Sequence, residues 1–237
     1  MNAPSPRPAP LLVFDLDGTL ADTAPDLIST LNLILAREGA PPLGYAEARD
    51  MLGAGARALV ERGLKAAGKT VSKERIEELF HAFVAHYGAH VADESRLFPG
   101  VEAALDGLAA QGFRFAVCTN KLEGLAVQVL EALGIAGRFD AICGQDTFRE
   151  ADGTNIPKPD PRMLAMTVEK AGGDLARAIL IGDSETDVAT ARNAGTPVIA
   201  VDFGYTTIPV RDLDPDAIIS HFDALPAAVA ALAKATA

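Results

Sequence analysis

The sequence lacks several features that would place it outside the soluble intracellular proteins. Its two cysteines, Cys118 and Cys143, each end an apolar segment, which favours reduced, buried thiols over a structural disulfide. No stretch reaches the roughly 18 uninterrupted apolar residues of a membrane span. Residues 1–10 are rich in Pro and lack the apolar core of a signal peptide, so we expect a disordered lead-in. These absences predict a cytoplasmic protein.

Basic residues are also scarce. The chain has 21 Lys and Arg against 32 Asp and Glu, a formal net charge of -11, and no Lys/Arg-rich block. This balance argues against a nucleic acid or an anionic membrane surface as a partner. A small anionic substrate would need positive charge placed locally, and the sequence leaves both a monomer and a homodimer open.

What the sequence does contain is an alternation of apolar runs and helical periodicity along its 237 residues. After a first run at 11–14, the predicted strands are 113–119, 139–143, 178–181, 198–201 and 217–219. The predicted helices are 100–111, a segment ending at 133, 160–171, 185–194 and 222–236. Such alternation predicts an α/β fold, with a parallel sheet covered by helices on both faces.

Residues 22–97 interrupt this order, because they show helical periodicity and no convincing strand. We expect an inserted all-helical cap domain at 22–97 and a catalytic core made of 11–21 and 98–237. An insert placed directly after the first strand would lie over the end of the sheet, where a lid can exclude water. Two apolar stripes support helices there: Leu27, Thr30, Leu31, Ile34 and Leu35, then Ile76, Leu79, Phe80, Phe83, Val84, Tyr87 and Val91.

Four strand ends carry polar residues suited to phosphate chemistry. The first follows residues 11–14, where Asp15 and Asp17 lie two positions apart and so point the same way in an extended chain. Gly18 then allows the backbone a sharp exit. Two neighbouring carboxylates at the end of a buried parallel strand need a cation or a shared proton.

The second and third strand ends carry Thr119-Asn120 and Lys158. A hydroxyl and backbone amides at a strand-to-helix turn can bind anionic oxygens, although turn or N-cap chemistry fits Thr119 and Asn120 equally well. Flanking prolines would present the Lys158 ammonium rigidly to a phosphate. Lys121 either assists binding or faces solvent.

The fourth strand end is followed by Asp183, Ser184 and Asp187. Asp183 would face the same edge of the sheet as Asp15, where a cation is needed to neutralise the carboxylates. Ser184 and Asp187 also fit the spacing of a capping box. Helix initiation and a role in the site are therefore both open for Asp187.

In this order and spacing, DLDGTL, the TN pair, the KPDP lysine and GDSETD resemble the four motifs of the haloacid dehalogenase superfamily, over roughly residues 11–202. The resemblance implies a Rossmann-like core and, because the insert lies between the first two motifs, a helical cap. It further implies a phosphatase that uses Mg²⁺ and forms an aspartyl-phosphate intermediate.

The resemblance also implies a role for each motif residue. Asp15 would be the nucleophile and Asp17 the general acid and base, while Asp15, the backbone carbonyl of Asp17, and Asp183 would bind Mg²⁺. Since the dehalogenases lack an acid at the position of Asp17, phosphoryl transfer is favoured over dehalogenation. The other motif residues are implied to bind phosphate, namely Gly18, Thr119, Asn120 and Lys158, or to support the site, namely Thr19, Ser184 and Asp187.

We expect the insert to select the substrate, because it contains a candidate substrate loop formed by Gly53, Gly55 and Arg57. Arg57 would pair with a carboxylate, and a helix-helix turn with a surface arginine is the alternative. This segment and Phe203-Gly204-Tyr205 resemble the phosphoglycolate phosphatase branch, which makes 2-phosphoglycolate the leading substrate. A sugar-phosphate phosphatase, for example one acting on N-acetylmuramic acid 6-phosphate, a phosphomutase and a non-catalytic binding module are the alternatives.

Overall fold

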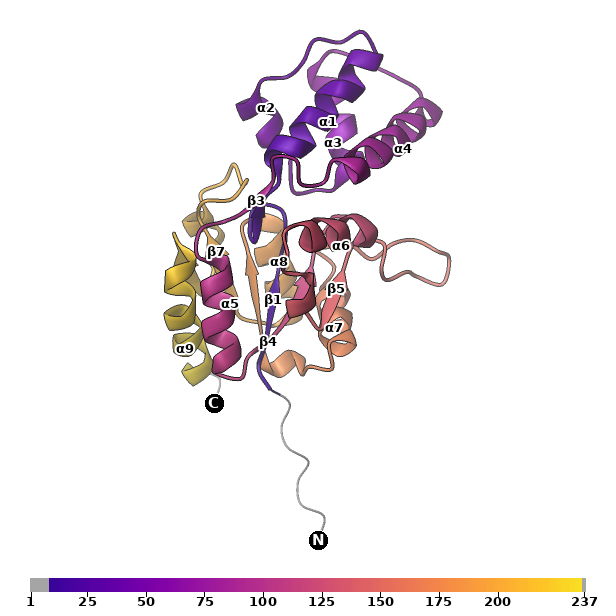
Figure 1. The fold of residues 1–237 in the computed structure, drawn as a ribbon. Coiled ribbons are helices and arrows are strands. Elements are labelled where there is room, and N and C mark those ends of the chain that lie inside the picture. Colours follow the sequence, from indigo (N-terminus) through magenta and orange to yellow (C-terminus); the bar gives the residue numbers. More distant parts are fainter. Residues whose placement is uncertain (1–8, 236–237) are drawn as a thin grey trace.

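The computed structural model describes residues 9–235, so most of the predicted lead-in at 1–10 lies outside the described residues. A six-stranded sheet, parallel throughout, forms the centre of the fold (Figure 1). The predicted α/β fold with a parallel sheet is therefore confirmed. In sheet order the strands are β5 (Ala141–Cys143), β4 (Arg114–Cys118), β1 (Leu11–Phe14), β6 (Ala178–Gly182), β7 (Val198–Val201) and β8 (Ala217–Ile219).

Helices bury both faces of this sheet. Alternate side chains of β1 enter different core clusters, with Leu12 and Phe14 in one and Leu11 and Val13 in the other. This is why all four residues are apolar and fully buried. The first cluster includes side chains of α5 (Val101–Ala110), α6 (Glu123–Ala132) and α9 (Leu225–Ala235), and the second those of α7 (Pro161–Lys170) and α8 (Glu185–Ala194).

Strand order places β1 at a switch point of the sheet. From β1 the chain continues to β4 and β5 on one side, then crosses to β6, β7 and β8 on the other. In open parallel sheets, the connections leaving such a point diverge and open a crevice beyond the carboxyl ends of the strands. The polar residues that follow β1, β4 and β6 therefore meet at one edge.

The insert contains α1 (Ala24–Arg37), α2 (Tyr45–Arg49), α3 (Ala56–Ala66) and α4 (Lys73–Ala89), which lie beyond this edge of the sheet (Figure 1). The predicted stripes form its interior, since Leu31 and Ile34 of α1 and Leu79 and Phe83 of α4 are buried. The exact division into a cap at 22–97 and a core stays a prediction.

Two short strands were not expected in this region. β2 (Ala21–Asp22) pairs in antiparallel fashion with β3 (Arg96–Leu97), so the two connections to the insert lie side by side. The expectation of no strand in residues 22–97 is therefore wrong at the two ends of this segment. A strand of two residues is too short to show the alternation of apolar and polar residues by which strands are predicted. The Asp26 carboxylate reinforces the pair by accepting hydrogen bonds from the backbone N–H groups of Glu94 and Ser95.

Among the described residues, four of the remaining connections contain a short 3₁₀-helix. The predicted helix at 222–236 begins with one of these 3₁₀-helices and continues as α9. Residues 144–156 form an excursion closed by a bridge between Arg149 and Asn155, the loop projecting beside α6 in Figure 1. The 3₁₀-helices are η1 (Ala136–Arg138), η2 (Leu175–Arg177), η3 (Val210–Leu213) and η4 (Phe222–Ala224).

Both cysteines are free and buried, as the sequence predicts, and they lie opposite each other in the register of β4 and β5. Burial raises the pKa of the Cys118 thiol to about 12, so it carries no charge at neutral pH. Within residues 9–235 we find no helix long and apolar enough to cross a membrane.

Candidate active site

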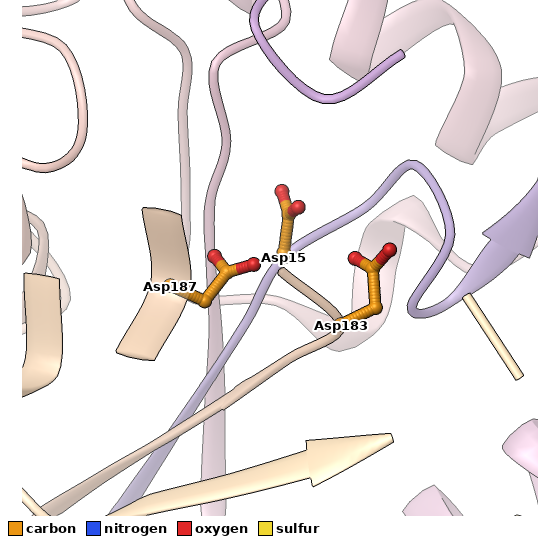
Figure 2. A group of neighbouring side chains, drawn as sticks. All are labelled: Asp15, Asp183 and Asp187. Atoms are coloured by element: carbon orange, nitrogen blue, oxygen red, sulfur yellow. The ribbon is translucent and has the colours of Figure 1, made fainter. Parts of the chain in front are cut away.

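Three carboxylates meet at the carboxyl edge of the sheet (Figure 2). Asp15 follows β1, Asp183 follows β6, and Asp187 lies in the first turn of α8. One oxygen of each lies within 4.8 Å of the others, and the residues are only 6%, 2% and 0% exposed. Buried like charges this close repel one another, so the cluster favours a bound cation or protons.

Glycines make this close arrangement possible. A Cβ atom on Gly18 would lie 2.5 Å from Asp183 Oδ2, one on Gly182 would lie 2.3 Å from Asp187 Cγ, and one on Gly204 would lie 2.2 Å from Asp183 Cβ. The φ of Gly18, +87°, is also one that residues with a side chain rarely adopt. Its backbone N–H donates to the Ala21 carbonyl, and its predicted contact with phosphate stays a prediction.

The electrostatics of the carboxylates differ from those of surface acids. Burial raises the pKa of Asp15 to about 6, with the charges of Asp187 and Asp17 adding to the rise and Lys158 opposing it. Burial and the charges of Asp187 and Asp15 raise the pKa of Asp183 to about 8. Asp15 Oδ1 has no hydrogen-bond partner among the described residues. The Lys158 ammonium lies 3.1 Å from this oxygen. A buried carboxylate oxygen that accepts no hydrogen bond is a ready ligand or nucleophile.

Asp183 is held in place by two donors. The Thr19 hydroxyl donates to its Oδ1 at 3.0 Å, and the backbone N–H of Tyr205 donates to its Oδ2 at 2.7 Å. Thr19 thus contacts the site as a supporting residue would. These bonds fix the orientation of the carboxylate at the mouth of the sheet.

Lys158 lies between two of the carboxylates. Its Nζ is 3.1 Å from Asp15 Oδ1 and 2.5 Å from Asp187 Oδ1, and all three side chains are buried. Although burial opposes the charged form, the two carboxylates outweigh it and raise the pKa of Lys158 above its usual range. The lysine is therefore a permanent cation next to Asp15.

Asp187 combines both roles that the sequence left open. Its Oδ1 binds Lys158, while its Oδ2 accepts hydrogen bonds from the backbone N–H and the hydroxyl of Ser184 at 3.1 and 2.6 Å. The same carboxylate therefore closes the N-terminus of α8 and orients the lysine. Ser184 lies one step further from the cluster, as a support for Asp187.

Asn120 positions Lys158 through the backbone. Its Oδ1 accepts a hydrogen bond from the Lys158 N–H at 2.9 Å, and its Nδ2 donates to the Lys158 carbonyl at 3.2 Å. Both ends of the Asn120 amide are thus used in holding the lysine segment. The neighbouring Thr119 is buried, and its hydroxyl accepts from the backbone N–H of Lys121 at 3.2 Å.

Asp17 pairs with Lys121, whose role the sequence left open. Lys121 is buried, and its Nζ lies 2.8 and 3.1 Å from the two carboxylate oxygens of Asp17. The Thr23 hydroxyl donates to the same carboxylate at 2.6 Å. Lys121 therefore lies in the candidate site. The sequence indicated this only through the position of Lys121 directly after Thr119-Asn120.

A cavity of ≈ 30 Å³ lies between the insert and the sheet edge. On this measure one water needs at least about 10 to 15 Å³, so the space admits only a small chemical group. Polar residues and glycines occur on one part of its wall and apolar side chains on the rest. The wall consists of Asp15, Asp17, Gly53, Gly55, Thr119, Asn120, Lys121, Leu27, Leu52, Ala56, Leu59, Phe83, Tyr87, Leu122 and Leu125.

The candidate substrate loop divides between this cavity and the surface. Gly53 and Gly55 line the cavity, and a Cβ on Gly55 would lie 2.9 Å from the Asn120 carbonyl oxygen. Arg57 is not part of that wall: its guanidinium pairs with Glu77 at 2.6 Å and lies 4.5 Å from the centre of the Phe80 ring. With 43% of its side chain exposed, Arg57 occupies a surface position. Its contact with substrate stays a prediction.

Tyr205 and Arg49 connect the site with the insert. The Tyr205 hydroxyl accepts from the backbone N–H of Thr23 at 2.7 Å and donates to Asp22 at 2.7 Å, where the chain enters the insert. Arg49 of α2 donates to the Gly204 carbonyl and lies over the Tyr205 ring. Sequence reasoning noted Tyr205 only as part of a branch resemblance and did not single out Arg49.

The cluster fits a hard divalent cation. Oxygen ligands are what Mg²⁺ binds, and Asp15 and Asp183 offer buried carboxylates, with Oδ1 of Asp15 accepting no hydrogen bond among the described residues. Both oxygens of Asp187 have hydrogen-bond partners, as do both oxygens of Asp183, and Asp187 is the partner of the Lys158 ammonium at 2.5 Å. The Asp17 side chain is not in the cluster, and its predicted share is the backbone carbonyl.

Comparison with known sequences agrees with this geometry. The profile of the family described as haloacid dehalogenase-like hydrolases matches residues 12–201, which contain all four motif segments. The chain belongs to this family. The family's name implies hydrolysis, and the buried carboxylates at the sheet edge are groups that can take part in it.

Relatives within the haloacid dehalogenase-like hydrolases cover nearly the whole chain. Proteins named phosphoglycolate phosphatase from Mesorhizobium japonicum and Caulobacter vibrioides are 45% and 46% identical to it, over 91% and 92% of the chain and 92% and 89% of their own lengths. A crystal structure of a predicted phosphoglycolate phosphatase from Haemophilus somnus is 30% identical and superposes with a TM-score of 0.84, over 92% of this chain and 97% of its own.

Proposed function

We propose that this hydrolase is a Mg²⁺-dependent phosphatase that cleaves 2-phosphoglycolate to glycolate and phosphate through an aspartyl-phosphate intermediate. Phosphatase activity on a small phosphorylated substrate follows from the family and from a relative that is 45% identical over 91% of the chain. The identity of the substrate rests on the name those relatives carry.

The observation that carries the mechanism is the ion pair between Asp15 Oδ1, which accepts no hydrogen bond among the described residues, and the Lys158 ammonium 3.1 Å away. Asp15 attacks the phosphorus in line, which forms a bond from its carboxylate oxygen to phosphorus and breaks the bond to the leaving alkoxide. Water then releases phosphate and restores the carboxylate. Lys158, next to the nucleophile, stabilises the negative charge on the transferring oxygens.

Asp17 acts as the general acid and base. Its carboxylate lies on the cavity wall together with Asp15, so both reach a substrate placed there. Asp17 gives a proton to the leaving oxygen of glycolate and later removes one from the attacking water. A poor leaving group such as an alkoxide needs this proton, in contrast to a halide.

Magnesium would be held by Asp15, Asp183 and the backbone carbonyl of Asp17. When bound, the ion neutralises the clustered carboxylates and the charge of the phosphate. Thr119 and Lys158 contact the phosphoryl oxygens directly, whereas Asn120 acts by holding the Lys158 backbone. Asp187 orients Lys158, and Thr19 and Ser184 orient Asp183 and Asp187.

We also propose a cytoplasmic location, supported by two free thiols, and a cap formed by residues 22–97 that shields the reaction from water. The net charge of -11 supports a protein without nucleic-acid or membrane partners.

A panel of phosphorylated metabolites, assayed with Mg²⁺ and with EDTA, tests the proposal. We expect phosphate release to be fastest from 2-phosphoglycolate and to be lost in EDTA. Asp15→Asn should lower kcat by at least about 10³-fold, since no covalent intermediate forms. The matched control is Asp106→Asn, which removes the charge of an exposed acid of α5 that pairs with Arg138. Full activity of Asp15→Asn would contradict the mechanism, and isomerised sugar phosphate in place of free phosphate would indicate a mutase.

A further inference from the structure

Lys121 occupies an unusual position, because the reaction as described does not need it. Its side chain is 4% exposed and its Nζ lies against Asp17 and 4.5 Å from the centre of the Tyr87 ring. Although burial opposes the charge, Asp17 outweighs it and raises the pKa of Lys121 above its usual range. A fully buried ammonium is costly, and Asp17 compensates it in the substrate-free protein.

The cavity wall shows what this charge is suited to bind. Among the described residues that line it, Lys121 is the one cation, and the rest of the wall is acidic, neutral or apolar. Arg57, the cation that the sequence suggested for this purpose, pairs with Glu77 at the surface instead. A second anionic group on a substrate therefore finds its counter-charge at Lys121.

Tyr87 of α4 supplies an independent observation. The residue is 0% exposed and lines the same cavity, and its hydroxyl lies next to the Lys121 ammonium, a donor, and meets no hydrogen-bond acceptor among the described residues. Burial raises the pKa of Tyr87 to about 12, so the hydroxyl keeps its proton and can donate it in a hydrogen bond. A buried hydroxyl whose proton has no acceptor is rare, which points to an acceptor on a ligand.

We infer that Lys121 and Tyr87 form a carboxylate subsite that selects phosphomonoesters of short 2-hydroxy acids. This inference rests on the proposed function and deepens it. In such an ester a single carbon separates the carboxylate from the bridging oxygen. If Asp17 protonates that oxygen, Lys121, 2.8 Å from Asp17, is within reach of the carboxylate. The Lys121 ammonium comes from the loop after β4 and the Tyr87 hydroxyl comes from the insert. A bound carboxylate therefore contacts both the sheet edge and the insert.

The test compares two substrates of nearly equal size, 2-phosphoglycolate and 2-hydroxyethyl phosphate, which carries a neutral CH₂OH group in place of the carboxylate. The measured quantity is the ratio of their kcat/KM values. We expect Lys121→Met and Tyr87→Phe each to lower this ratio by at least about tenfold, the size expected when a hydrogen bond to a charged group is lost. A purely structural role would lower both rates and leave the ratio unchanged.

Matched controls are Lys170→Met, which removes a half-exposed lysine on α7, and Tyr45→Phe, which removes an exposed hydroxyl on α2. Both should keep the wild-type ratio. If either Lys121→Met or Tyr87→Phe keeps the ratio within about twofold of the wild type, the subsite is overturned. Activity on 2-hydroxyethyl phosphate shows that each variant is folded.

A binding measurement separates this inference from the proposed function. In the Asp15→Asn background, calorimetry should show tighter binding of 2-phosphoglycolate than of 2-hydroxyethyl phosphate, and Lys121→Met should remove the difference. If the wild type binds 2-phosphoglycolate in this way without hydrolysing it, the proposed function fails and the subsite stands. If the wild type hydrolyses it and Lys121→Met leaves both preferences intact, the subsite fails and the function stands.

Discussion

Lys158 and Asp187 form an ion pair with 2.5 Å between Nζ and Oδ1, and both side chains are almost completely buried. The pair joins the third and fourth motif segments, which lie far apart in the sequence. Because Asp187 also receives two hydrogen bonds from Ser184 at the start of α8, the position of the lysine depends on how that helix begins. The geometry of the proposed phosphate site thus depends on helix capping as well as on charge.

Asp187→Asn tests this dependence. The amide keeps the shape of the carboxylate and removes its charge, so Lys158 loses one of its two anionic partners. We expect kcat to fall about 10- to 100-fold, as is usual when a residue that orients an active-site group is changed. Steady-state kinetics on 2-phosphoglycolate provides the measurement, and Asp106→Asn on the surface of α5 the control. An unchanged kcat would show that Asp187 serves only α8.

Asn120→Ala tests whether the backbone of Lys158 must be held. The variant loses both hydrogen bonds to residue 158 and leaves the cluster of carboxylates intact. We expect kcat/KM to fall by at least about tenfold, since misplacing a catalytic group costs activity steeply. Asn193→Ala is a close control, because Asn193 donates to the carbonyl of the next residue, Pro159, from an exposed position. Equal losses in the two variants would argue against a role for Asn120 in catalysis.

Tyr205→Phe tests the link between the site and the entry to the insert. The variant keeps the backbone N–H that donates to Asp183 and removes the hydroxyl that contacts Asp22 and Thr23. Leaving the buried Thr23 N–H without a partner should lower the free energy of unfolding by about 1–3 kcal/mol. Urea denaturation measures this change, with Tyr45→Phe as the exposed control. Identical unfolding midpoints in wild type and Tyr205→Phe would refute the expectation.

The raised pKa values predict how pH and metal affect stability. In the folded protein the pKa of Asp183 is about 8 and that of Asp15 about 6, against a usual value of 3.8, so the folded state holds protons that the unfolded chain releases. Between about pH 4 and pH 8 their contribution therefore lowers stability as pH rises. Since a cation replaces these protons, Mg²⁺ should raise Tm more at pH 8 than at pH 5.

Thermal unfolding in EDTA and in excess Mg²⁺ at the two pH values provides the measurement. Asp183→Asn is the internal control, because Asp183 has a more strongly raised pKa than Asp15. This variant should lose most of the increase in Tm that Mg²⁺ causes. An increment of equal size at both pH values, or one that persists in Asp183→Asn, would mean that the carboxylate cluster is not the metal site.

Much of the fold could be predicted because its signals are local. The strands at 11–14, 198–201 and 217–219 coincide with β1, β7 and β8, since short apolar runs between turns are what a covered parallel sheet requires. Asp15 and Asp183 were also predictable as neighbours, because the carboxyl ends of parallel strands share one edge. The two-residue strands β2 and β3 were not predicted. They are too short to show the alternation that marks a strand, and each is stabilised by a partner about 75 residues away in the sequence.

The sequence by itself determined the chemistry at each strand end: two acids after β1, a hydroxyl and an amide after β4, a lysine before α7 and two acids around the start of α8. Tertiary structure decided which side chains these groups meet. It paired Lys121 with Asp17, Asn120 with the backbone of Lys158, and Arg57 with Glu77 at the surface. The physical reason is that an ion pair or hydrogen bond requires two atoms to lie about 3 Å apart in space. The number of residues between two side chains in the sequence does not tell how far apart their atoms lie in the folded protein.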